Sequence, residues 1–468
     1  MDSLAANLHD LELTELAARI RTGEISPVAV TRAQLDRIAA LDGTLGSYAL
    51  VMADVAMEQA QAAEAEVAAG RYRGPLHGVP IAVKDLFWTK GAATAAGMAV
   101  YKNYRPSDDA TVVRRLRDAG AVLLGKLQLT EGAYSDHHPS VTPPKNPWNA
   151  DHWPGISSSG PAVATAAGLC FGALASDTGG SIRWPAAANG VTGLKPSWGR
   201  VSRYGVFELA ATLDHVGPIT RSAADAAVIL GAIAGPDPRD PIAVLAPVPD
   251  YVAAAARDVR GLRIGVDAVW NRDDVDATTQ AVVSEAAEAF RMLGATIVDV
   301  RFPDVTQTIA DWVPNCAVEA AVAHATTYPA RKDEYGAVLA GVLEGGRALA
   351  GADYQKILLR RLELRGRVAA LFGAIDVLLI PVQPFPPLSL ATIKTLGEQP
   401  DLIAKLQRYT CPFNMTGHPT ITLPGGFSAA GLPVAFQLVA ADLGEATLVR
   451  AGAAFQRVTS WHRRHPCI

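Results

Sequence analysis

FGALASDTGGS, residues 171–181, is the stretch that decides the fold of this chain. Residues 171–176 form a short, mostly apolar run, which is typical of a buried strand. Residues 177–181 are rich in glycine and predict a tight loop, and the apolar segment 182–189 follows as a helix. A strand, a tight loop and a helix in this order are a building unit of α/β sheets.

The same alternation continues on both sides of this stretch. Ser26 has the character of an N-cap with Pro27 at the first helical position, and Gly43 is expected to end that helix. Residues 146–160 predict a loop, and residues 305–405 are mostly helical. We predict further strands at residues 78–85, 121–124, 261–266, 296–300 and 376–381, and further helices at 11–22, 26–41, 53–69, 111–119, 161–169, 223–234 and 276–293.

Length and composition indicate a large folded protein. The chain has 468 residues and a mass of 49.1 kDa, with 49% hydrophobic and 19% charged residues, which excludes a disordered chain. No internal repeat or flexible linker interrupts it, so we expect one domain over residues 1–468, with 305–405 as a variable elaboration. The net charge of −4 favours no polyanion-binding face, so nucleic acid is not an expected partner.

The cysteine pattern and the N-terminal sequence indicate the cellular compartment of the protein. Its four cysteines are widely spaced without a C-x-x-C pair, which predicts neither a disulfide framework nor a zinc site. The adjacent pair His137 and His138 lacks further ligands at metal-binding spacing, so no metal is expected. Because no secretory signal and no apolar run of membrane-spanning length is visible, we expect a soluble, cytoplasmic protein.

Two serine-rich loops are the strongest candidates for chemistry, at residues 154–160 and 177–181. A serine hydroxyl attacks carbonyl carbon well only when a base accepts its proton. No histidine stands in a G-x-S-x-G or H-E-x-x-H pattern, whereas Lys84 ends an apolar strand, where burial lowers a lysine pKa. A phosphate-binding role for Gly179 and Gly180 is disfavoured because neither common glycine-rich phosphate motif is present.

Several long motifs, in order, resemble those of the amidase signature family. The resemblance covers nearly the whole chain, and its motif core lies at about residues 74–220. It implies one large α/β domain, with a twisted mixed β-sheet flanked by helices on both faces. The segments that carry it are GVPIAVKD (78–85), KNPWN (145–149), SDTGGSIR (176–183) with Pro185-Ala186, GVTGLKP (190–196), PFNMTGHP (412–419) and GLPV (431–434).

The resemblance also implies a Ser–cis-Ser–Lys triad without metal or organic cofactor. Ser181 maps to the nucleophile and Lys84 to the base. Ser157 stands 24 residues before Ser181, which is the family's separation, so Ser157 rather than Ser158 or Ser159 maps to the cis-serine. The backbone N–H groups of Thr178, Gly179 and Gly180, with Ser181, map to the oxyanion hole; glycines leave such amides free to point inward. Asp177 is expected to hold its loop together.

The first serine loop departs from the family pattern. Ile156 and Ser159 stand where the family typically has glycine, and Pro161 stands where it has serine. Ile156 does not easily take a positive φ, so we expect a reshaped loop or a narrowed pocket. Trp312 and Tyr335 are expected to line the substrate side, together with Ile156.

We therefore expect a hydrolase for the C–N bond of a non-peptide amide or a carbamate that carries aryl or alkyl groups, acting through a Ser181 acyl-enzyme as a monomer or homodimer. A glutaminase-type subunit of a tRNA-dependent amidotransferase is the alternative, and it would need partner subunits. A scaffold that has lost activity is a third hypothesis, which the intact triad disfavours.

Overall fold

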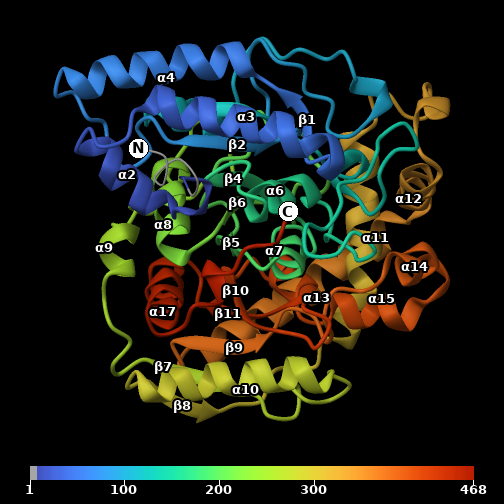
Figure 1. The fold of residues 1–468 in the computed structure, drawn as a ribbon. Coiled ribbons are helices and arrows are strands. Elements are labelled where there is room, and N and C mark those ends of the chain that lie inside the picture. Colours follow the sequence, from blue (N-terminus) through green and yellow to red (C-terminus); the bar gives the residue numbers. More distant parts are fainter. Residues whose placement is uncertain (1–7) are drawn as a thin grey trace.

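Eleven strands form one mixed sheet through the middle of the molecule, in the order β1-β3-β2-β4-β6-β5-β10-β11-β9-β7-β8. In the computed structural model, which describes residues 8–468, this order runs from top to bottom in Figure 1. The strands are β1 (Tyr48–Val51), β2 (Pro80–Lys84), β3 (Val122–Leu127), β4 (Gly172–Asp177), β5 (Thr192–Lys195), β6 (His215–Thr220), β7 (Arg263–Val266), β8 (Thr296–Asp299), β9 (Val377–Pro381), β10 (Thr420–Phe427) and β11 (Pro433–Ala440).

The sheet contains both parallel and antiparallel strand pairs, and its central pairs place the ends of several strands side by side. Strand β2 runs parallel to both β3 and β4, so the residues that follow β2 and β4 leave the sheet at the same edge. Strand β6 runs antiparallel to β4, with Asp177 opposite His215, so residues just before β6 reach this edge too. The carboxyl ends of the central strands therefore collect Lys84, the 177–181 loop and the segment before β6.

The inner strands of the sheet are buried on both faces, and their alternate residues enter different cores. In β2, Ile81 and Val83 join the largest hydrophobic core, whereas Ala82 joins a second core on the other face. In β9, Leu379 lies in the largest core and Leu378 in a third one. Strands buried on both faces need a helical layer on each side.

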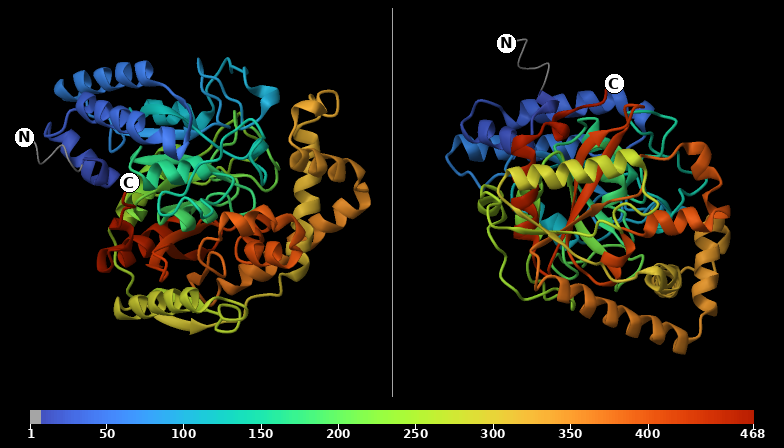
Figure 2. Two further views of the ribbon diagram at one scale, coloured as in Figure 1. Left: turned by 45° about the vertical axis from the view of Figure 1, so that its right-hand side comes forward. Right: turned by 90° about the horizontal axis from the view of Figure 1, so that it is seen from below.

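Helices α8, α10 and α17 supply much of the layer over the largest core, and α3, α4, α6 and α13 pack against the opposite face. Helices α11, α12 and α13 stand together at one side of the molecule (Figure 2). The α-helices are α2 (Leu13–Arg21), α3 (Pro27–Leu45), α4 (Ala53–Ala68), α5 (Thr111–Asp118), α6 (Ser159–Ala166), α7 (Arg183–Asn189), α8 (Ala223–Ile233), α9 (Tyr251–Ala255), α10 (Ala277–Met292), α11 (Thr306–Ala323), α12 (Ala337–Ala348), α13 (Gly351–Leu371), α14 (Leu390–Lys394), α15 (Pro400–Gln407), α16 (Cys411–Met415) and α17 (Glu445–Val458).

The α/β class and the helical character of residues 305–405 are confirmed, while two predicted helix ends are wrong. Helix α3 does not stop before Gly43: it continues to Leu45 and ends at Gly46, whose φ of 65° makes it the left-handed C-cap. Helix α6 begins at Ser159, inside the segment predicted as loop, and holds Pro161 in its first turn. The missing N–H of a proline removes no helical hydrogen bond there.

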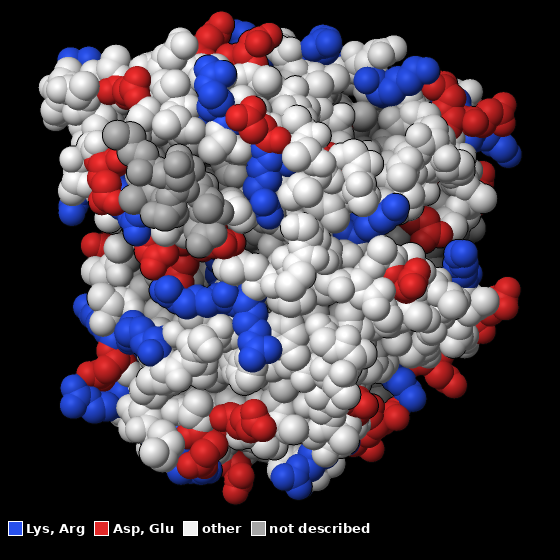
Figure 3. Space-filling view, viewed as in Figure 1, with Lys and Arg blue, Asp and Glu red and all other residues white. Residues whose placement is uncertain are grey.

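The surface carries charged side chains of both signs, in agreement with the nearly balanced acidic and basic composition. On the face in Figure 3, acidic and basic side chains are interspersed, and an area below and to the right of the centre carries few of either. No helix within residues 8–468 is both long and apolar enough to cross a membrane. In the same part of the chain no cluster of three or more His, Cys, Asp or Glu side chains is arranged to hold a metal ion.

Candidate active site

Lys84 is the last residue of β2 and is buried completely between β3 and β4. Its Nζ atom lies 2.7 Å from Ser157 Oγ, 2.9 Å from Ser158 Oγ and 2.9 Å from Ser176 Oγ. The structure thus brings the predicted base to the predicted cis-serine and adds two hydroxyls that the sequence did not indicate. An ammonium without a carboxylate in direct contact is unstable in such a place, which favours the neutral amine.

The hydrogen-bond donors around Lys84 can be assigned one by one. Ser158 Oγ donates its only proton to the Ser176 carbonyl at 3.1 Å, so it can only accept from Lys84. If Ser176 Oγ also accepts, a neutral lysine uses its two N–H groups on these oxygens. The remaining lone pair of Nζ then faces Ser157 Oγ. This arrangement lets Ser157 donate its proton to Lys84, which is what a relay requires.

Burial also changes the charge of Lys84. Removal from water lowers its pKa from 10.5 to about 7, although the carboxylates of Asp177 and Asp214 act in the opposite direction. A lysine of this kind is half neutral near pH 7, and it is then able to accept a proton. The prediction that the surroundings hold Lys84 neutral agrees with this direction.

The loop that carries Ser157 is held by glycines at positions where no side chain fits. Gly155 has a φ of 77°, and a Cβ on it would lie 2.4 Å from Pro185 Cα. A Cβ on Gly160 would lie 2.5 Å from backbone atoms of Gln128. The positive φ thus falls on Gly155, and the peptide bond from Ile156 to Ser157 is cis. The substitution at Ile156 leaves Ser157 beside Lys84.

Two of the three departures from the family pattern, Ile156 and Ser159, each make a contact of their own. Ser159 Oγ lies 3.2 Å from His137 Nε2, whose pKa burial lowers to about 4. Ile156 packs against an apolar cluster that contains Trp153 and Trp184. Side chains thus occupy positions where glycine would leave open space.

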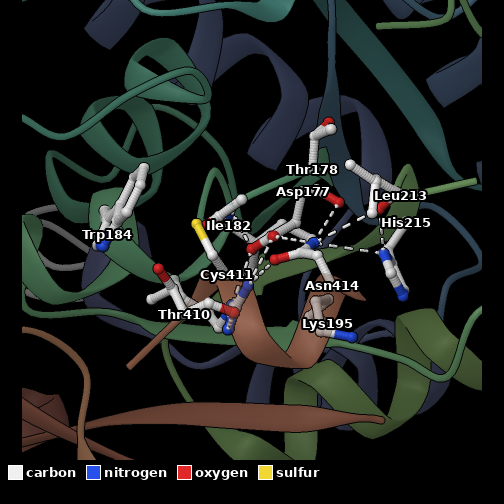
Figure 4. A network of polar contacts seen from close by, with 12 residues as sticks. Asp177, Thr178, Ile182, Trp184, Lys195, Leu213, His215, Thr410, Cys411 and Asn414 are labelled. Atoms are coloured by element: carbon white, nitrogen blue, oxygen red, sulfur yellow. Dashed lines mark hydrogen bonds and ion pairs between the residues drawn. The ribbon is translucent and has the colours of Figure 1, made fainter. Parts of the chain in front are cut away.

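A buried ion pair holds the second serine loop. The Asp177 carboxylate accepts hydrogen bonds from the Ile182 amide at 3.0 Å, from Arg183 Nε and Nη2 at 3.0 and 2.9 Å, and from Asn414 Nδ2 at 2.8 Å (Figure 4). Burial by itself would raise its pKa, but Arg183 and the hydrogen bonds outweigh burial and keep the pKa below its ordinary value. The prediction that Asp177 holds its loop together is confirmed.

Two tryptophans enclose the glycines of this loop. A Cβ on Gly179 would lie 2.5 Å from the Trp312 ring, and one on Gly180 would lie 2.6 Å from the Trp184 ring. Trp312 Nε1 donates to the Thr178 carbonyl at 2.9 Å. Within residues 8–468, the amide N–H groups of Gly179, Gly180 and Ser181 donate no backbone hydrogen bond. These amides are therefore free to bind an incoming oxygen atom.

The remaining predicted residues, Ser181, Trp312 and Tyr335, lie in different surroundings. Ser181 is 7% exposed, whereas Lys84 and Ser157 are fully buried, so Ser181 is the member of the proposed triad open to a ligand. Trp312 touches the 177–181 loop, as described. The Tyr335 hydroxyl lies 2.6 Å from Thr327 Oγ1 and 3.0 Å from His324 Nδ1, in another part of the 305–405 region.

Several residues of the site were not predicted from the sequence. Ser158 and Ser176 contact Lys84, and Asp214 accepts a hydrogen bond from the Thr178 hydroxyl at 2.6 Å. Asn414 lies inside the motif at residues 412–419, so its place in a motif was a usable signal. Asp214 gave no such signal, because only the β4–β6 pairing brings it to the loop.

Comparison with known proteins decides the family. The family model described as Amidase matches residues 29–449, which is most of the chain. The chain belongs to the amidase signature family. It is a hydrolase of C–N bonds other than peptide bonds.

Two curated relatives show the breadth of the family around this amidase. The protein named "Putative amidase AmiD" of Mycobacterium tuberculosis (strain ATCC 25618 / H37Rv) is 50% identical over 457 residues, covering 97% of this chain and 96% of that protein. A glutamyl-tRNA(Gln) amidotransferase subunit of Geobacter sp. (strain M21) is 37% identical over 482 residues, covering 97% of this chain and 98% of that one.

Solved structures share the fold over nearly the full chain. One, described as a vestigial protein complex that reveals the evolutionary origins of an s-triazine catabolic enzyme, superposes with a TM-score of 0.88 at 32% identity and covers 96% of this amidase and 98% of that chain. A bacterial aryl acylamidase of the same family superposes with a TM-score of 0.86 at 25% identity, covering 97% of each chain. The amidase signature fold is therefore shared.

Proposed function

We propose that this amidase cleaves non-peptide amides or carbamates with aryl or alkyl groups, through an acyl-enzyme on Ser181. The observation that carries the proposal is the buried contact of 2.7 Å between Lys84 Nζ and Ser157 Oγ, beside a loop whose amides are free. Ser157 is then the relay and Lys84 is the base. Thr178, Gly179 and Gly180, with Ser181, supply the oxyanion-hole amides.

The first half of the reaction forms the acyl-enzyme. Ser181 Oγ attacks the carbonyl carbon while its proton passes to Ser157 Oγ, and the Ser157 proton passes to Lys84 Nζ. The negative charge that develops on the carbonyl oxygen is stabilised by the loop amides. When the C–N bond breaks, the leaving nitrogen takes a proton from Ser157, which regains one from Lys84.

The second half releases the product. Water attacks the acyl carbon and gives its proton to the same relay, and Ser181 recovers a proton as the acid departs. Both halves need Lys84 to alternate between neutral and charged forms. A pKa of about 7 suits this exchange near neutral pH.

The preference for apolar substrates rests on the surroundings of the 177–181 loop. Trp184, which packs on Gly180, belongs to an apolar cluster with Trp153, Val382 and Leu406. Partly buried Ile156 and Phe385 pack against this cluster. Apolar groups at this place favour apolar substrate groups, and each buried methylene adds about 0.8 kcal/mol of binding, or roughly fourfold in kcat/KM. The solved aryl acylamidase is consistent with this class of substrate.

The second candidate function is that of a glutaminase-type subunit in a tRNA-dependent amidotransferase. It is favoured by the 37% identity to a glutamyl-tRNA(Gln) amidotransferase subunit. Such a protein would prefer glutamine, a small polar amide, which the apolar cluster does not favour.

A substrate panel with the purified chain separates the two functions. p-Nitroanilides and aryl carbamates of increasing size are compared with acetamide and glutamine, and the Ser181→Ala variant serves as the blank. We expect the aryl substrates to have the higher kcat/KM, increasing with size until the pocket is full. Glutamine or acetamide as the best substrate, with bulky anilides inert, would contradict the proposed substrate class.

A further inference from the structure

Asp214 lies directly before β6 and is 5% exposed, beside the loop that follows β4. One carboxylate oxygen, Oδ1, accepts the Thr178 hydroxyl at 2.6 Å. The other, Oδ2, accepts the Leu209 and Ala210 amides at 3.0 and 3.2 Å. Asp214 therefore links the 177–181 loop to its own turn, residues 209–214, through three hydrogen bonds.

Thr178 is held from two sides. Its side chain is fixed by Asp214, and its carbonyl accepts the Trp312 indole N–H at 2.9 Å. With both the side chain and the carbonyl of Thr178 fixed, rotation of the following Gly179 amide is restricted. Glycines leave amides free to rotate, so a loop of this composition needs such anchors to hold its N–H groups in one direction.

The turn that carries Asp214 is itself attached to the helices at the side of the molecule. The Thr212 amide and hydroxyl donate to Glu319 of α11 at 2.7 and 2.6 Å. Arg361 of α13 donates to the Thr212 hydroxyl and carbonyl at 2.6 and 2.9 Å. Asp214 thus stands on a rigid base, as a group must if it is to position another one.

Charged and titratable groups surround Asp214 on several sides. Burial raises its pKa to about 6, and Arg203 lowers it in part. Asp214 also acts on two neighbours. Burial lowers the pKa of Lys84, and the charge of Asp214 raises it in part. For the buried thiol of Cys316, burial and Asp214 both raise the pKa. Asp177, paired with Arg183, is the other carboxylate that acts on Lys84.

We propose that Asp214 is a positioning residue of this amidase: through the Thr178 hydroxyl it fixes the backbone amides of the oxyanion hole, and its buried negative charge acts on Lys84. The inference rests on the proposed function, because it needs Ser181 as nucleophile and Lys84 as base. It adds a residue that touches neither the substrate nor the reacting atoms, but governs two groups that do.

Two variants separate the two actions of Asp214. Asp214→Asn keeps the size of the side chain and removes its charge, so we expect kcat to fall about 10- to 100-fold and the acid limb of the pH profile to move about one unit lower. Thr178→Val removes the hydroxyl and keeps the carboxylate. It should lower kcat over a similar range while the acid limb moves much less, and Thr178→Ser should restore most of the rate.

The experiment measures kcat, KM and the pH profile with an aryl amide, together with the rate of labelling by a fluorophosphonate. A merely structural role would lower thermal stability without moving the acid limb. If folded Asp214→Asn keeps the wild-type kcat and an unmoved acid limb, the inference is overturned while the proposed function stands. The same holds if Thr178→Val keeps the wild-type kcat. Failure of the unmodified chain to label at Ser181 would overturn both the inference and the proposed function. If Asp214→Asn does not fold, the comparison of Thr178→Val with Thr178→Ser decides.

Discussion

Lowering the pH through 7 should inactivate the enzyme by protonating Lys84. With a pKa of about 7, half of the lysine is neutral at pH 7, compared with about 0.04% for a lysine at its ordinary value of about 10.4. Burial thus increases the active form of the base by about a thousandfold. Below pH 7, kcat/KM should fall tenfold per pH unit, to about 1% of its plateau at pH 5, and above pH 8 it should be level.

The assay is the initial rate with an aryl amide between pH 5 and 10, with enzyme stability checked at each pH. Lys84→Ala should lose most of the rate and the limb at pH 7. Histidines near the site do not explain a limb at this pH, because burial lowers the pKa of His137 to about 4 and that of His215 well below its ordinary value. A rate that keeps rising to pH 10, or a limb that survives in Lys84→Ala, would refute the reasoning.

The remaining predictions concern the serines, the pocket and stability. Ser181→Ala should abolish turnover and fluorophosphonate labelling while circular dichroism shows an intact fold. Ser158→Ala should lower the rate roughly tenfold, because Ser158 only accepts a hydrogen bond from Lys84. Ser157→Ala should lower the rate at least about 100 times more than Ser158→Ala does. Ile156→Gly should lower the preference for large aryl groups, measured as a ratio of kcat/KM values. The pKa of folded Lys84 lies below that of the unfolded chain, so unfolding takes up a proton between about pH 7 and 10.4. Over that window the stability of the wild type should rise with pH relative to Lys84→Met, by about 1.4 kcal/mol per unit, and a constant difference in urea titrations would contradict the lowered pKa.

The strand and helix pattern was readable wherever the apolar period was clear. The segments around β2, β4 and α8 carry their own signals, in short apolar runs and glycine turns. Strands β10 and β11, which are neighbours along the chain and pair with each other, were not predicted; the Pro-Gly-Gly stretch inside β10 interrupts its apolar pattern. Gly43 alone predicts the end of the helix, yet a single glycine costs a long helix only about 1 kcal/mol, which packing offsets.

For the site, motif order located Lys84, Ser157 and Ser181 but not their surroundings. Ser176 became a partner of Lys84 through the parallel pairing of β2 with β4, and Ser158 through the fold of the loop before α6 that also carries Ser157. Asp214 reaches Thr178 across an antiparallel strand pair. Contacts of this kind depend on tertiary register, which local sequence does not specify.

Mass spectrometry of the trapped intermediate tests the central claim most directly. The purified chain is mixed with an aryl carbamate or a fluorophosphonate, quenched, digested and mapped, with Ser181→Ala and Lys84→Ala treated in parallel. We predict one adduct of the expected mass on Ser181, absent from Ser181→Ala and strongly slowed in Lys84→Ala. An adduct on Ser157 or Ser158, or turnover of an aryl amide by Ser181→Ala, would contradict the proposed Ser181 acyl-enzyme.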